Sequence, residues 1–248
     1  TTQLICANGS PPDANGRCAD GSVPKPVGTT GSTGSTPSGT TGGPTTGSTT
    51  QLICAVGSPP DANGRCADGS VPKPVIFGTP GDDVIEGTSG IDQIAAGYGN
   101  DKVSAKEGND LVGGNDGVDE LYGNEGDDTL AGGEGNDKMS GGLGNDKSGD
   151  DPGNDIILGD EGEDKISGGP GNDQLNGGDG NDELKGGSDD DIIIGGNGND
   201  SYLSGGPGND HLAGGEGSDW FYCGDGTDTV DDYNPNEDHI PNADCEIK

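Results

Sequence analysis

The sequence is poor in the residues that build a hydrophobic core. Aromatic residues make up 3% of its 248 residues and all hydrophobic residues 25%, while the formal net charge is −35. Such a composition is typical of disordered chains, which bury too little apolar surface to offset the conformational entropy lost on folding. The 54 glycines add further backbone freedom. We therefore infer that something other than apolar burial folds this chain.

Basic residues are also scarce. Lys and Arg number 11 against 46 Asp and Glu, and the excess acid lies downstream of residue 75. Such a surface repels phosphate, which argues against nucleic acid and anionic membranes as partners and favours cations. No apolar run approaches the roughly 20 residues of a membrane span. The chain starts at Thr1 rather than Met, and we expect that an export signal has been removed.

Sequence motifs of common enzymes are missing. The chain has no H-E-x-x-H, no Gly-x-Ser-x-Gly and no His near a Ser or Cys nucleophile. Its two histidines, His211 and His239, fit solvated surface positions. We expect no catalytic residues and no enzyme activity.

The six cysteines fall into three local pairs. Zinc sites need clustered ligands such as C-x2-C, and two histidines cannot complete such a site here. Disulfides in an oxidising, extracellular compartment are the better interpretation. The predicted disulfides are Cys6–Cys18, Cys54–Cys66 and Cys223–Cys245.

The first part of the chain contains a near-exact duplication. Residues 1–27 and 49–75 differ only at Asn8 and Val56, and we call each copy an arm. A linker of Gly, Thr, Ser and Pro at residues 28–48 separates the arms. The second arm continues through a short entry strand to residue 77, so its segment is 49–77. Glycans are plausible on the linker and on Asn8, and an unmodified flexible linker is equally compatible.

From Gly78 to Asp231 the sequence repeats every nine residues. We count seventeen nonapeptides, with one extra residue assigned to Ser204. The sixth place is always Asp and the fourth is Gly in all units but one, where Asp189 stands. The eighth place is apolar except at Ser148. The predicted metal ligands are the sixth-place residues Asp83, Asp92, Asp101, Asp110, Asp119, Asp128, Asp137, Asp146, Asp155, Asp164, Asp173, Asp182, Asp191, Asp200, Asp210, Asp219 and Asp228.

Each nonapeptide predicts a six-residue turn and a three-residue strand. Glycines in the turn allow positive φ, and Asn or Asp in the fifth place tolerates the left-handed region. In the strand only the eighth residue is expected to point inward. Two units then form one coil with a strand on each side, which is a two-sheet solenoid.

Stacked coils place the sixth-place carboxylates in columns with a spacing of about 4.7 Å. Bare columns of like charge would repel the coils from one another. Dense carboxylate and carbonyl oxygens suit a hard cation with many oxygen ligands, which favours calcium over magnesium. One cation between successive turns on each edge gives about 15 calcium ions, and their charge nearly cancels that of the chain.

These units resemble the hemolysin-type calcium-binding repeat of the RTX family, with its Gly-Gly-x-Gly-x-Asp-x-apolar-x consensus. The resemblance covers residues 78–231. It implies an all-β, right-handed parallel β-roll in which the sixth-place Asp and turn carbonyls hold calcium. Asp150-Asp151-Pro152 and Ser148 depart from the consensus and predict a weak coil.

The flanking segments differ from the family pattern. The chain ends at Lys248, soon after the repeats, and has three cysteine pairs. These features favour export by a general pathway, in an archaeon or another maker of glycosylated surface proteins, over the family's one-step secretion. We expect residues 232–248, tied down by Cys223–Cys245, to cap the last coil.

The outward positions carry no repeated Thr, which argues against ice binding. They are mixed and typical of a solvated face, although Ile156, Leu158, Ile192 and Ile194, with Trp220 and Tyr222 on the other sheet, could form adhesive patches.

Two functions fit the sequence. One is a calcium-binding extracellular or cell-surface structural protein that assembles through its arms, as a filament or surface-layer component. The other is a calcium-dependent carrier module of a larger RTX-type toxin or secreted enzyme. The two arms and the linker favour the first.

Overall fold

The structure is a computed structural model that describes residues 4–5, 25–26, 49–53, 73–149, 152–241 and 245–248. The predicted disulfides Cys6–Cys18 and Cys54–Cys66, and the predicted glycan sites on Asn8 and residues 28–48, lie outside these ranges. In the described part of the chain, no helix is long and apolar enough to span a membrane.

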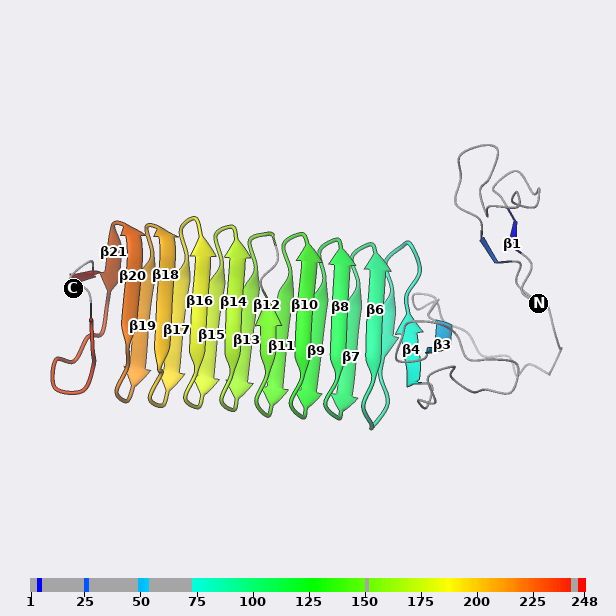
Figure 1. The fold of residues 1–248 in the computed structure, drawn as a ribbon, viewed down its shortest axis with the longest axis horizontal. Helices are drawn as coiled ribbons and strands as arrows, with labels where there is room; N and C mark the ends of the chain where they lie inside the picture. Colours follow the sequence, from blue (N-terminus) through cyan, green and yellow to red (C-terminus); the bar gives the residue numbers. More distant parts are fainter. Residues whose placement is uncertain (1–3, 6–24, 27–48, 54–72, 150–151, 242–244) are drawn as a thin grey trace, which may run out of the picture. The chain divides into compact units, whose positions relative to one another are not determined.

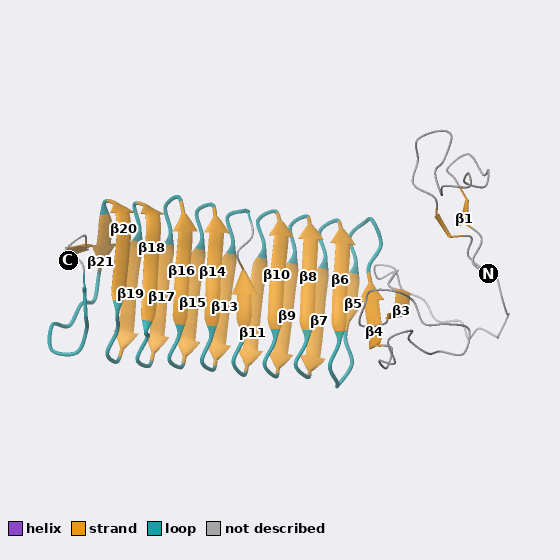
Figure 2. Cartoon of the chain, in the orientation of Figure 1, coloured by secondary structure: helices purple, strands orange, loops and turns teal. Residues whose placement is uncertain are grey.

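The chain divides into two units, Thr1–Gly43 and Pro44–Lys248. In the first unit, β1 (Leu4–Ile5) and β2 (Lys25–Pro26) pair antiparallel. All remaining strands belong to the second unit, where they form two ten-stranded sheets. Short turns join most of the strands between residues 84 and 230, and the described residues contain no helix (Figure 2).

From residue 73 to residue 230, successive strands alternate between the two sheets, so each coil of the second unit contributes one strand to each (Figure 1). Neighbouring strands of the coils are parallel, as the nine-residue period predicts. In spatial order the first sheet contains β20 (Phe221–Gly226), β18 (Tyr202–Gly208), β16 (Glu183–Ser188), β14 (Lys165–Pro170), β12 (Lys147–Gly149), β10 (Thr129–Glu134), β8 (Leu111–Asp116), β6 (Gln93–Tyr98), β4 (Lys73–Phe77) and β3 (Thr49–Ile53). The second contains β22 (Cys245–Ile247), β21 (Asp228–Val230), β19 (His211–Glu216), β17 (Ile192–Asn197), β15 (Gln174–Asp179), β13 (Ile156–Glu161), β11 (Lys138–Leu143), β9 (Glu120–Glu125), β7 (Lys102–Glu107) and β5 (Val84–Glu86).

The expected division into a six-residue turn and a three-residue strand was wrong. Most interior strands have six residues, from the seventh place of one unit to the third place of the next, as in β7. The reason is that second- and third-place residues still pair with the neighbouring coil, for example Lys106 with Asn124. First-place residues also point inward, as the fully buried Ala96 and Ala105 show.

Left-handed backbone occurs in the second place, and the expectation that Asn or Asp adopts it in the fifth place was also wrong. The described residues other than glycine with positive φ are Lys106, Asn115, Asn124, Asp160 and Asp189. The first four stand in the second place, and Asp189 stands in the fourth. Fifth-place Asn and Asp side chains instead accept hydrogen bonds from the backbone of a neighbouring coil, as Asn145 Oδ1 does from the Glu163 N–H at 2.9 Å.

The extra residue lies before Tyr202 and was wrongly assigned to Ser204. Asp182 still bonds to Asp200, 18 residues on, but Glu183 pairs with Tyr202, 19 residues on. The backbone therefore bulges at Ser201. As a result Leu203, not Tyr202, fills the inward position and is fully buried.

The core between the two sheets is built around a row of inward eighth-place side chains, with buried first-place residues such as Ala96, Ala105 and Cys223 beside it. The row runs from Ile76 and Ile85 at one end to Phe221 and Val230 at the other. Ser148 interrupts the row, where it pairs with Leu130 on one side and Ile166 on the other. Its strand, β12, has three residues where β10 and β14 have six.

At each end of the roll an additional strand pairs with one of the two sheets. At one end β3 pairs antiparallel with β4, which in turn pairs with β6 through Ile76 and Ile94. At the other end β22 pairs with β21, and the predicted disulfide Cys223–Cys245 is present. The expectation that residues 232–248 cap the last coil stays a prediction, and the disulfide and the pairing of β22 with β21 support it.

The apolar residues expected to form adhesive patches do not form one surface. Ile156 and Ile192 are exposed on the second sheet, but Gln174 of β15 lies between them. The Trp220 ring stacks on His239 and the Tyr222 ring on Tyr202.

Candidate metal centre

The sixth-place aspartates lie at the turns in two columns, one at each edge of the roll. All are almost fully buried, with 3% exposure at most. The first column contains Asp83, Asp101, Asp119, Asp137, Asp155, Asp173, Asp191, Asp210 and Asp228. The second contains Asp92, Asp110, Asp128, Asp146, Asp164, Asp182, Asp200 and Asp219. The structure therefore places all seventeen predicted residues in these two columns.

A ladder of hydrogen bonds links the members of each column. Within a column, the N–H of an aspartate donates to Oδ1 of the aspartate one coil further on, as from Asp101 to Asp119 at 2.7 Å and from Asp119 to Asp137 at 2.8 Å. Hydrogen bonds to an ionised acceptor are short and strong. The ladder fixes one oxygen of each carboxylate and thereby sets the direction of the other.

In thirteen of the interior aspartates the second carboxylate oxygen is buried and has no hydrogen-bond donor. A buried carboxylate oxygen without a partner costs several kcal/mol, so it implies a ligand of positive charge. These Oδ2 atoms belong to Asp101, Asp110, Asp119, Asp128, Asp146, Asp164, Asp173, Asp182, Asp191, Asp200, Asp210, Asp219 and Asp228.

First-place glycines leave room beside these Oδ2 atoms. A Cβ on Gly114 would lie 2.2 Å from Asp119 Oδ2 and 2.5 Å from the carbonyl oxygen of Gly132. Gly123 and Gly177 stand in the same relation to Asp128 and Asp182. A carboxylate oxygen and a main-chain carbonyl oxygen thus converge on a cradle that a side chain would fill.

The donors in this cradle are all oxygens, which suits a hard cation such as calcium. Among the described residues no three His, Cys, Asp or Glu side chains converge on one point. A cation held here must therefore take part of its ligand set from backbone carbonyls.

Burial changes the acidity of the columns. Desolvation raises the pKa of Asp164, Asp191 and Asp200 to about 7. Neighbouring carboxylates contribute to this rise in pKa, and the N–H from the preceding aspartate opposes it. Desolvation likewise raises the pKa of Asp128 and Asp146 to about 6. Without a cation, the columns resist full ionisation near neutral pH.

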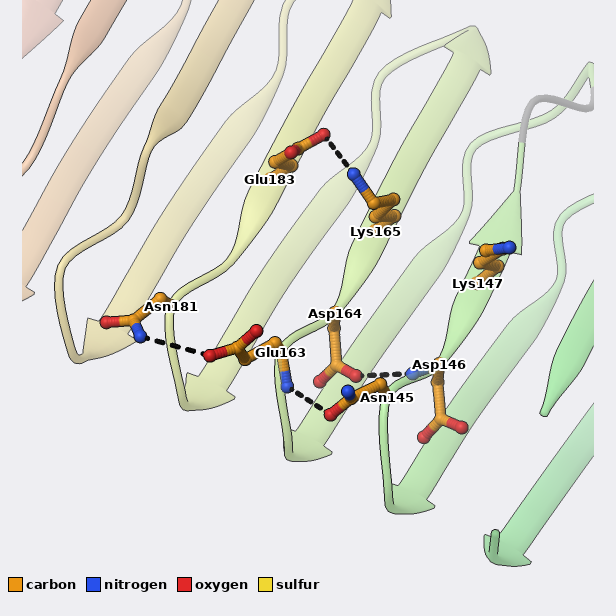
Figure 3. Close-up of a pocket in the computed structure, with 8 residues that line it drawn as sticks. All are labelled: Asn145, Asp146, Lys147, Glu163, Asp164, Lys165, Asn181 and Glu183. Carbon is orange, nitrogen blue, oxygen red and sulfur yellow. Dashed lines mark hydrogen bonds and ion pairs between the residues drawn. The ribbon is translucent and has the colours of Figure 1, made fainter. Parts of the chain in front are cut away.

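Figure 3 shows how the turn edge around Asp146 and Asp164 is braced. The Asp146 N–H donates to Asp164 Oδ1 at 2.7 Å, and Lys165 forms an ion pair with Glu183 at 2.7 Å on the strands above. The pocket at this edge has a volume of 240 Å³. Lys147 and Lys165 lie outside the carboxylate column, so their positive charge does not compensate the negative charge of its aspartates.

One member of the columns was not predicted from the sequence. Asp219 donates its N–H to Oδ1 of Asp238 at 3.2 Å, so Asp238 extends the second column by one step. The nine-residue period places Glu237 at this position. Asp238 could have been found by reading residues 232–240 as one more, irregular nonapeptide that is shifted by one residue.

Comparison with known families agrees with this geometry. The model of the RTX calcium-binding nonapeptide repeat matches residues 77–112, 113–147, 150–184, 167–202 and 202–230.

The chain belongs to the RTX calcium-binding repeat family. Its roll is therefore a non-catalytic calcium-binding fold, and calcium is its cation. The matches leave out residues 148–149, which include Ser148 and precede the departures from the consensus at residues 150–152. No curated protein matches the chain significantly by sequence.

Proposed function

We propose that this RTX protein is a non-enzymatic structural component of the extracellular space or cell surface. Calcium folds its roll, and its two N-terminal arms join copies of the chain into a filament or surface layer. The observation that supports calcium-driven folding is the row of buried Oδ2 atoms without hydrogen-bond donors.

The interior aspartates are the proposed calcium ligands, together with first-place carbonyl oxygens such as that of Gly132. Bound calcium supplies positive charge between carboxylates that otherwise repel one another. One ion between successive aspartates gives about 15 ions, which contribute about +30. This charge nearly cancels the net charge of −35.

Calcium and folding are then one equilibrium. We expect weak individual sites, with dissociation constants of about 0.1 to 1 mM, because extracellular calcium modules bind in that range. Neighbouring coils that share ions make the transition steep. Circular dichroism during a calcium titration of the full chain tests this, and a β spectrum unchanged by exhaustive chelation would contradict it.

An extracellular location is supported by the Cys223–Cys245 disulfide. Disulfides persist in oxidising compartments, and sites this weak fill only where calcium reaches millimolar concentration. Export can be tested by fractionating the cells that make the protein and detecting the chain in the medium or at the surface.

Assembly through the arms is supported by their matching backbone pairing. Leu4 pairs with Pro26 in the first arm as Leu52 pairs with Pro74 in the second. The second arm uses the other edge of β4 to join the roll. The first arm contains the same strand pair, which can add to a strand edge of another copy.

Deleting residues 1–48 separates assembly from folding. The truncated chain should still fold with calcium but should no longer form the oligomers of the intact chain, as seen by electron microscopy and light scattering. Equal assembly of both chains, or an intact chain that stays monomeric in millimolar calcium, would refute a role of the arms in assembly.

A further inference from the structure

The aspartates of the first coil differ from those of the interior coils in the hydrogen bonds that their Oδ2 atoms accept. Asp83 Oδ2 accepts hydrogen bonds from the N–H of Thr79, at 2.5 Å, and from its hydroxyl, at 2.9 Å. Asp92 Oδ2 accepts the same pair from Thr88, at 2.6 and 3.0 Å. These two oxygens therefore have the donors that the interior Oδ2 atoms lack.

The cause lies in the second place of the nonapeptide. Every other described residue at this place, whether Gly, Lys, Asn or Asp, has positive φ, as in Lys106 and Gly133. Thr79 and Thr88 do not. A β-branched side chain strongly disfavours the left-handed region, so threonine directs its N–H to the carboxylate four residues on.

The glycine cradle changes accordingly. A Cβ on Gly78 or Gly87 would lie 2.9 Å from Oδ2 of Asp83 or Asp92, against 2.2 Å for Gly114 and Asp119. At the same two glycines the carbonyl oxygens of Ala96 and Ala105 would be closer, at 1.9 and 2.3 Å. The two oxygens of the cradle thus take a different arrangement where threonine holds the carboxylate.

The second column ends in a similar way. Asp238 Oδ2 accepts the N–H of Asn234 at 2.7 Å, again from a residue four positions earlier. Both ends of this column thus close with protein donors, and only its interior Oδ2 atoms remain open.

We propose that Thr79 and Thr88 cap the calcium columns, so that Asp83 and Asp92 are hydrogen-bonded residues and bind no cation. The inference rests on the proposed calcium binding of the interior aspartates. It removes two of the seventeen residues that the repeat alone predicts as ligands. The second place of each nonapeptide thereby decides whether its aspartate is open to calcium.

Matched substitutions in the full chain test the proposal. Asp83→Asn and Asp92→Asn keep an oxygen that can accept the threonine donors but remove the charge. Asp119→Asn and Asp128→Asn make the same change at interior positions of the same two columns. Native mass spectrometry counts bound calcium, and circular dichroism gives the calcium concentration at half-folding.

The terminal variants should keep the wild-type number of ions and the wild-type midpoint. Each interior variant should lose about one ion and need several-fold more calcium to fold. Equal losses in the terminal and interior variants would overturn the proposal. A wild-type chain that binds no calcium would instead overturn the proposed function as well, so the two failures are distinguishable.

The reverse substitution provides an independent measurement. Thr79→Gly and Thr88→Gly permit positive φ and remove the hydroxyl donor, so each should free one carboxylate and add about one bound ion. Thr79→Val keeps the β-branched side chain and the N–H donor and serves as the control, with an unchanged count. A Gly variant that folds with the wild-type number of ions would refute the role of the second place.

Discussion

Ser148 pairs with Leu130 in the core row of the first sheet, so a hydroxyl group stands where neighbouring strands bury aliphatic side chains. Replacing Ser148 with Val should stabilise the calcium-loaded roll by about 1 kcal/mol, because it adds buried apolar volume. Urea denaturation in saturating calcium measures the change. Ser204→Val, at an outward position of β18, is the control and should have little effect. A destabilised Ser148→Val would show that the coil has no room for the side chain.

Substitutions at Tyr202 and Leu203 distinguish the bulge at Ser201 from a regular repeat. Leu203→Ala should lower the free energy of unfolding by about 2 to 4 kcal/mol because it leaves a cavity in the core. Tyr202→Ala should cost less, since it removes only an outward ring stacked on Tyr222 at 4.6 Å. A regular nonapeptide register predicts the reverse order. Denaturation of both variants under identical calcium concentrations decides between them.

Acidification should stabilise the roll when calcium is absent. The pKa of Asp164, Asp191 and Asp200 is raised from 3.8 to about 7 by burial. The folded state then binds more protons than the unfolded state, so stability is greatest below the unfolded pKa and is lost as the pH rises through about 7. In chelator, circular dichroism should show more β structure at about pH 5 than at neutral pH.

The Asp164→Asn, Asp191→Asn and Asp200→Asn triple variant is the control for this pH dependence. It removes three titrating groups and should flatten the dependence in chelator. In calcium the dependence should reverse, because protons compete with the cation for the same carboxylates. A metal-free wild-type chain that unfolds further on mild acidification would contradict the prediction.

Removing the Cys223–Cys245 disulfide should weaken the C-terminal end of the roll. The bridge closes a segment with a sequence separation of 22 and fixes β22 beside β21. Cys245→Ala should therefore lower the free energy of unfolding by about 3 kcal/mol, because the unfolded chain gains conformational entropy when the cross-link is removed. Hydrogen exchange should increase first in β21 and β19, while exchange in β7 and β9 stays at the wild-type rate. Uniform loss of protection along the roll would indicate instead that it unfolds as one unit.

The nine-residue period predicted the features that depend on repetition alone. Because Asp119 and Asp137 are two units apart, their stacking on one edge follows from the period, as do the parallel sheets. The length of the strands did not follow, because the pairing of Lys106 with Asn124 depends on a left-handed backbone that composition does not reveal.

Local exceptions were harder still to predict. The bulge before Tyr202 could not be placed because Tyr202 and Leu203 both satisfy an apolar position. Asp238 was missed because Glu237 occupies the regular place with the same charge. The role of Thr79 becomes visible only when its N–H and hydroxyl are seen to reach the same oxygen.

The two side-chain ladders at each turn run in opposite directions along the roll. Sixth-place residues donate their N–H forward, as Asp146 does to Asp164, whereas fifth-place residues donate backward, as Glu163 does to Asn145. A tensile force along the roll axis would load both ladders of a coil boundary together with the sheet hydrogen bonds beside them. The boundary at Ser148, where a hydroxyl interrupts the apolar row between Leu130 and Ile166, then becomes the expected point of mechanical rupture, and single-molecule pulling would report it as the first extension step.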